Sequence, residues 1–173
     1  MSNINRFKYD YIWVKTKASN FASCRKVPMK YHEIISIFYD KGITYNMPNL
    51  HKIEPIKSSR KNKGGSIKMC ANNDDCYMQS ESGFNKSLLY YSNKSGKGYS
   101  LHPTQKPVEL IEELIKIYTN EGDLVLDNCM GSGTTAVACI NTNRNFVGFE
   151  TEEKYYNIAN KRIEDVKSQL KLF

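Results

Sequence analysis

Three features of the stretch 123–150 have residue types and a spacing that suit the binding of a nucleoside. Asp127 follows a short apolar run, residues 131–133 form a Gly-Ser-Gly turn, and Glu150 is an acid 19 positions after Gly131. A glycine turn lets a ligand approach backbone N–H groups closely, and a carboxylate at about this offset meets ribose hydroxyls in α/β folds. The pattern therefore predicts half of a nucleoside-binding α/β unit.

A strand, a helix and a second strand must position these groups. Residues 124–126 (Leu-Val-Leu) have no polar alternation, which is typical of a strand buried on both faces of a parallel sheet. Ser132 or Thr134 can cap the helix that follows the turn. The second strand is predicted over residues 146–149 and ends at Glu150.

The glycine turn is not specific by itself, because such turns also serve only to pack a helix closely on a strand. No third glycine follows at the dinucleotide offset and no GK[ST] at the phosphate-loop offset. NAD and ATP are therefore not the natural ligands, and an adenosyl ligand without a pyrophosphate fits better. Glu150 also has an alternative role, since an acid just before a helix favours the helix N-terminus.

The composition indicates a globular protein. The 173 residues are 40% hydrophobic and 12% aromatic, enough for one ordinary domain with a core. We expect a cytoplasmic protein without membrane contact, because no apolar run has membrane-spanning length and the first ten residues are polar and basic. The five cysteines are odd in number and include no CxxC pair, which argues against a disulfide framework and against a metal site.

The net charge of +7 is unevenly distributed. Residues 1–100 contain 17 Lys and Arg against 7 Asp and Glu, whereas residues 101–173 contain 8 against 11. The basic part also holds 14 of the 20 aromatic residues, a combination that suits base stacking and backbone contact. This favours a nucleic-acid-facing part joined to a cofactor-facing part, with a merely solvated basic face as the alternative.

Residues 1–44 predict two strands. Residues 7–15 alternate with aromatic side chains on one face, and residues 34–39 form a second run after a long basic connection. We expect the two to pair as a hairpin. Trp13 is expected in the core, and His32 in a structural role.

Residues 45–100 show no clear period and are expected to form an irregular insertion. Four cations with no acid between them can contact DNA phosphates or form a solvated loop: Lys57, Arg60, Lys61 and Lys63. Residues 101–173 contain a helix from Pro107, the nucleoside-binding unit and a last helix from about Thr151. The last helix is expected to bury Tyr155, Tyr156, Ala159, Ile163 and Val166.

Three segments together closely resemble the C-terminal half of the β-type amino-methyltransferases of DNA: HPTQKP (102–107), LDNCMGSGTTAVAC (126–139) and NFVGFE (145–150). These are the site-specific N6-adenine and N4-cytosine enzymes of restriction-modification systems and phages. The resemblance implies an α/β chain with a partial Rossmann-like, S-adenosylmethionine-dependent methyltransferase fold and a basic, irregular insertion. It divides the chain into the end of the catalytic half (1–44), a target-recognition insertion (45–100) and the cofactor-binding half (101–173).

The same resemblance implies residues that bind S-adenosyl-L-methionine. The family's tenth motif, which closes over the methionine end, matches His102, Pro103, Thr104, Gln105, Lys106 and Pro107. Its cofactor motif matches Asp127, Cys129, Gly131, Ser132, Gly133 and Thr134, with Cys129 where the family usually has Phe, and Glu150 matches the ribose-binding acid. The implied reaction is methyl transfer to an exocyclic amine of a base flipped out of double-stranded DNA.

The family's catalytic loop, [DNS]PP[YFW], has no counterpart, because the sequence contains no Pro-Pro. We therefore expect no catalytic residue here, and a site-specific DNA methyltransferase present as a fragment or as one part of a split enzyme, with an upstream polypeptide as partner. The alternative is a non-catalytic DNA-binding or cofactor-binding remnant. A small-molecule methyltransferase has less support, because the basic insertion would then be unexplained.

Overall fold

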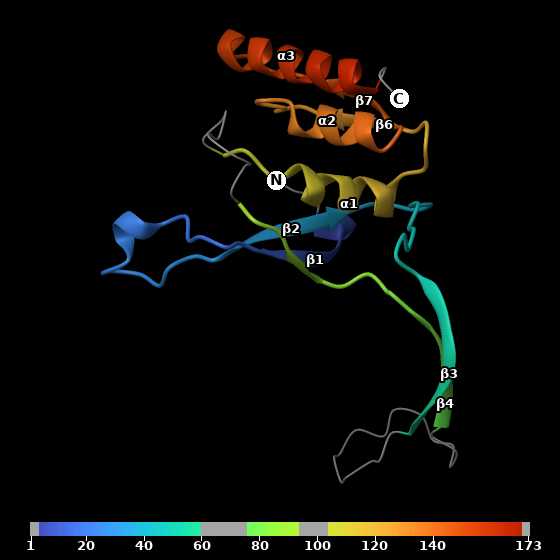
Figure 1. Ribbon diagram of the computed structural model, residues 1–173. Helices are drawn as coiled ribbons and strands as arrows, with labels where there is room; N and C mark the ends of the chain where they lie inside the picture. The colour runs from blue at the N-terminus through green and yellow to red at the C-terminus, as the bar shows by residue number, and fades with distance from the viewer. Residues whose placement is uncertain (1–3, 60–75, 94–103, 171–173) are drawn as a thin grey trace. The chain divides into compact units, whose positions relative to one another are not determined.

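The computed structural model describes residues 4–59, 76–93 and 104–170 (Figure 1). They belong to two compact units, one of Met1–Asn46 with Lys86–Phe173 and one of Met47–Asn85. The larger unit contains the residues of both cofactor motifs that the structure describes. No helix in the described ranges has the length and apolar character needed to cross a membrane.

The first sheet of the larger unit has the order β2-β1-β5. The strand β1 (Phe7–Val14) pairs antiparallel with β2 (His32–Phe38), as the alternating pattern predicted, and short 3-10 helices lie at Ile4–Arg6 and Phe21–Ser23. The strand β5 (Leu88–Tyr90) pairs parallel with β1, although it was expected within the insertion. Three residues are too few to show a period, so only their pairing reveals the strand.

The helix α1 (Val108–Tyr118) packs between this sheet and α2 (Thr134–Asn141), as Figure 1 shows. Leu110 is fully buried against Tyr11 and Trp13 of β1, which confirms the core position of Trp13. Pro107 is not the first helical residue as expected; it is the N-cap, with extended backbone (ψ 139°). The missing N–H of proline costs nothing at either position.

The predicted strand-helix-strand unit is present. The strands β6 (Leu124–Asp127) and β7 (Asn145–Gly148) pair in parallel, α2 connects them, and α3 (Glu153–Leu170) packs on α2. In α3, Ala159 and Ile163 are buried as expected, whereas Tyr156 is 49% exposed. Tyr156 therefore lies off the stripe that faces α2.

Burial of the β6-β7 sheet is limited to one face. Val125 and Phe146 pack against the helices, but Leu124 and Leu126 are each 65% exposed and Phe149 is 59% exposed. The expectation that residues 124–126 are buried on both faces is therefore wrong within the described residues. An apolar run of this kind suits a strand that is covered on both faces of its sheet, whereas the three helices cover only one face.

The smaller unit is a hairpin of β3 (His51–Ser59) and β4 (Cys76–Ser82). It differs from the irregular segment that was expected. The register shifts between Lys52 and Ile56, and Pro55 lies in that interval, where its lack of an N–H costs no ladder hydrogen bond. The irregular register explains why no strand period is visible in the sequence.

Candidate functional site

The turn between β6 and α2 depends on glycines in conformations that other residues rarely adopt. Gly131 has a φ of 53° and Gly133 a φ of 79°, both in the left-handed region. Gly133 also lies against α3, since a Cβ atom added there would come within 2.9 Å of the Cβ of Ala159. The chain can therefore enter α2 while in close contact with α3.

The carboxylate of Asp127 holds this turn together. Its Oδ1 accepts a hydrogen bond from the backbone N–H of Cys129 (3.0 Å), and its Oδ2 accepts one from Thr135 Oγ1 in α2 (2.5 Å). Asp127 thus joins the end of β6 to the first turn of α2. Thr135 was not singled out in the sequence, because a threonine in the first turn of a helix has many other uses.

The backbone N–H groups of the turn are largely used inside the protein. Four of them donate to protein acceptors: those of Cys129, Met130, Gly131 and Gly133. The expectation that a ligand meets exposed N–H groups here is therefore wrong for these four. A phosphate at a helix N-terminus needs such groups. Their engagement supports the inference that a pyrophosphate is not the ligand.

Ser132 and Thr134 do not cap α2 as expected, because the N-cap is Gly133 and no side chain bonds there. Ser132 is 3% exposed and its Oγ donates to Gln105 Oε1 at 3.4 Å. Arg162 of α3 donates to the backbone oxygen of Ser132 at 2.6 Å, and burial lowers the pKa of this guanidinium. Arg162 therefore ties α3 to the turn, a contact that no local sequence signal indicates.

Glu150 lies two residues after the end of β7, and both of its carboxylate oxygens accept hydrogen bonds. Oε2 accepts a hydrogen bond from the backbone N–H of Gly131 at 2.8 Å, and Oε1 accepts one from that of Glu152 at 2.9 Å. The second contact lies just before α3, in agreement with the alternative role at a helix start. Each carboxylate oxygen can accept more than one hydrogen bond, so both roles remain compatible.

A pocket of about 180 Å³ lies where the two motifs meet. The segment before α1 contributes Thr104, Gln105 and Lys106 to its lining. The turn contributes Asp127, Cys129, Gly131, Ser132 and Thr134. Three further lining residues were not expected, Ile111, Met130 and Thr135, whereas Pro107, Gly133 and Glu150 lie outside the lining.

Several expected site residues fall outside the described ranges. They are His102 and Pro103 of the first motif and Arg60, Lys61 and Lys63 of the basic run. The backbone of Lys57 lies in β3, opposite Met78 of β4.

The structure describes the side chains of three cysteines. Cys24, Cys129 and Cys139 are free, and burial raises the pKa of the Cys139 thiol to about 11. In those same ranges, His, Cys, Asp and Glu side chains form no group of three that could hold a metal ion.

Comparisons with known proteins place this geometry in a family. The chain is 51% identical over 63 residues to the type II methyltransferase M.BglI of Bacillus subtilis and 41% identical over 78 residues to M.HpaI of Haemophilus parainfluenzae. These alignments cover 36% and 45% of this chain but only 18% and 24% of the relatives. The chain therefore aligns with less than a third of the length of each of these two relatives.

Two solved structures are similar over most of the chain. The crystal structure of the M1.HpyAVI–SAM complex has a TM-score of 0.59 and 30% identity, and covers 91% of this chain and 62% of that one. The cytosine-N4-specific PvuII DNA methyltransferase has a TM-score of 0.60 over 94% of this chain and 57% of its own, but at 17% identity it supports the fold alone. Residues 1–161 match the family of DNA methylases designated N6_N4_Mtase. The chain belongs to this DNA methylase family.

Proposed function

We propose that this chain forms the cofactor-binding part of a site-specific DNA methyltransferase that acts on adenine N6 or cytosine N4 in the cytoplasm. The observation that carries the proposal is the pocket between Thr104–Lys106 and the glycine turn, where both motifs of the resemblance meet. Membership in a DNA methylase family, and the similarity to an enzyme crystallised with S-adenosylmethionine, support the same cofactor here.

The chemistry of the pocket suits an adenosyl ligand better than a nucleotide phosphate. Its described lining contains one carboxylate, Asp127, and one ammonium, Lys106, whose Nζ is 2.9 Å from Glu33 Oε2. Four N–H groups of the turn are already engaged, which leaves fewer backbone donors for a phosphate. S-Adenosylmethionine has no phosphate and carries a positive charge on sulfur, and when bound it supplies an activated methyl group.

The described pocket forms only part of such a site. Its volume of about 180 Å³ lies below the roughly 300 Å³ at which pockets for drug-sized ligands begin. In our proposal His102 and Pro103 also bind the cofactor. A further segment, which carries the [DNS]PP[YFW] loop, completes the site. If this segment lies on the same polypeptide, the present sequence is a piece of the enzyme; if it lies on a partner, the enzyme is split. The alternative, a non-catalytic binding remnant, shares the pocket and differs only in lacking that segment.

Titration calorimetry with S-adenosylmethionine tests the cofactor assignment. We expect Glu150→Ala to weaken binding by about 1–3 kcal/mol, the scale for the loss of a charged hydrogen bond. Glu152→Ala is the control for the loss of a negative charge near the turn. It retains the Glu150 side chain and the Glu152 backbone N–H, so both hydrogen bonds of Glu150 to Gly131 and to the start of α3 can still form. Equal affinity in the wild type and Glu150→Ala would leave this acid only its structural contacts with Gly131 and the start of α3.

Double-stranded DNA is the proposed substrate, and its affinity should fall steeply with salt because Lys and Arg displace counterions from phosphates. Neutralising Lys57, Arg60, Lys61 and Lys63 together should reduce the slope of log affinity against log salt by about one unit for each lost contact. A second variant neutralises the exposed cations Arg25, Lys26 and Lys30 of the β1–β2 connection. A slope that the quadruple variant leaves unchanged would remove residues 57–63 from the interface, whatever the second variant does.

A further inference from the structure

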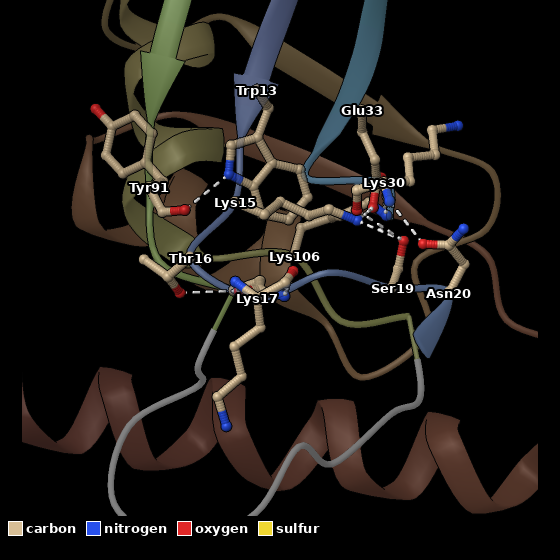
Figure 2. A network of polar contacts seen from close by, with 11 residues as sticks. Trp13, Lys15, Thr16, Lys17, Ser19, Asn20, Lys30, Glu33, Tyr91 and Lys106 are labelled. Atoms are coloured by element: carbon tan, nitrogen blue, oxygen red, sulfur yellow. Dashed lines mark hydrogen bonds and ion pairs between the residues drawn. The ribbon is translucent and has the colours of Figure 1, made fainter. Parts of the chain in front are cut away.

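One acidic residue outside the pocket connects the pocket to the first sheet. Glu33 in β2 accepts from two lysines: Lys15 Nζ lies 3.1 Å from Oε1, and Lys106 Nζ lies 2.9 Å from Oε2. We name these three residues the Glu33 bridge. Figure 2 shows them together beside Ser19 and the indole ring of Trp13.

The Lys15–Glu33 pair of the Glu33 bridge is held in place by its surroundings. The side chain of Lys15 is 2% exposed, and its ammonium also donates to Ser19 Oγ at 2.9 Å. The indole of Trp13 is buried, donates from Nε1 to the backbone oxygen of Tyr91, and lies within 6 Å of both ammonium groups (5.9 Å for Lys15 and 5.7 Å for Lys106). A buried ammonium requires a partner. Lys15 thus holds the Glu33 carboxylate in place independently of Lys106.

Lys106 connects the Glu33 bridge to the pocket. Lys106 belongs to the segment 104–106 that forms one wall, and the neighbouring Gln105 accepts a hydrogen bond from Ser132 on the opposite wall. The pocket lining does not include Glu33. Burial raises the pKa of Glu33, but the hydrogen bonds and charges of Lys106 and Lys15 outweigh it and hold this pKa below its usual range, which favours the ionised carboxylate.

We propose that Glu33 is a positioning residue for cofactor binding: by holding the ammonium of Lys106 against the first sheet, it sets the place of the pocket wall 104–106 relative to the glycine turn. Because the ammonium of Lys106 is bound to Glu33, Lys106 contributes to cofactor binding through this ion pair, which fixes the wall 104–106. This inference rests on the proposed cofactor and goes beyond it, because it assigns a role to a residue outside both motifs.

A double-mutant cycle on the affinity for S-adenosylmethionine tests the proposal in the full chain. Glu33→Gln should weaken binding roughly tenfold, the equivalent of one charge-assisted hydrogen bond. Lys106→Met should have a similar effect, and the double variant should be no worse than either single variant, because all three lack the same contact. Asp40→Asn is the matched control, because it breaks the exposed Arg6–Asp40 ion pair near the other end of β2 and should leave the affinity unchanged.

Two further measurements separate positioning from folding. Glu33→Gln leaves Lys15 buried without its carboxylate, so the variant Lys15→Met/Glu33→Gln removes both partners of the buried pair and should show the same loss of affinity in a folded chain. Amide hydrogen exchange at residues 104–106 should accelerate in Glu33→Gln even without ligand.

Each outcome bears on the proposal. Unchanged affinity in Glu33→Gln would overturn it, and so would effects of Glu33→Gln and Lys106→Met that are fully additive in the double variant. A loss of affinity in Lys106→Met far beyond that in Glu33→Gln would also overturn it, because Lys106 would then contact the ligand itself. Absence of binding by the unaltered chain would instead count against the proposed cofactor, and unchanged exchange at residues 104–106 would then overturn the positioning role separately.

Discussion

Gly133→Ala is expected to lower the free energy of unfolding by roughly 2–5 kcal/mol. Two costs add at this position: about 1–2 kcal/mol for a side chain in the left-handed region and about 1–3 kcal/mol for overpacking. The overpacking arises because the new Cβ would lie 2.9 Å from the Cβ and 3.2 Å from the Cα of Ala159 in α3. Contacts this close to a backbone atom require α3 or the turn to move.

Gly122→Ala provides a matched control for this experiment. Gly122 has nearly the same φ, 84° against 79°, but an added Cβ meets nothing within 4 Å. Denaturant unfolding of the two variants therefore separates backbone strain, which both share, from the contact with α3. The combination Gly133→Ala/Ala159→Gly should recover part of the loss. If Gly133→Ala and Gly122→Ala destabilise equally, the contact with Ala159 has no energetic cost and our account of this glycine is wrong.

Methyl transfer by this chain alone is expected to be undetectable. The sequence contains no [DNS]PP[YFW] loop, and such a loop would have to accept hydrogen bonds from the target amine. A second polypeptide carrying the loop and its flanking strands should restore transfer of labelled methyl groups from S-adenosylmethionine to duplex DNA. A version of that polypeptide with the loop prolines changed to alanine is the control for simple sheet completion.

The same experiment has a physical readout besides activity. Leu124 and Leu126 are each 65% exposed and Phe149 is 59% exposed on one face of the β6-β7 sheet, and β6 pairs with β7 alone in the ranges that the structure describes. Exposed apolar surface and open strand edges favour association. Sedimentation should therefore show self-association of the isolated chain, which decreases when the second polypeptide binds. A monomer that unfolds cooperatively and methylates DNA by itself would refute this prediction.

Local patterns in the sequence were sufficient for the elements that carry the motifs. Period-two alternation predicted β1 and a second run predicted its hairpin partner β2. An apolar run, a Gly-Ser-Gly turn and a further run predicted β6, α2 and β7. These predictions succeed because strand period and glycine conformation are properties of a few consecutive residues. The same reasoning missed β5 and the β3–β4 hairpin, since a three-residue strand and a shifted register leave no period to detect.

Only the tertiary structure determined how the site is supported. The sequence alone determined that a nucleoside-type turn and an acid are present, and the resemblance it carries identified HPTQKP as their companion. It could not determine that four N–H groups of the turn are already bonded, that Arg162 holds Ser132 across 30 positions, or that Glu33 meets Lys106 across 73 positions. These contacts join residues distant in the chain, and they depend on the packing of α1 against the first sheet and of α3 on α2, which no local pattern records.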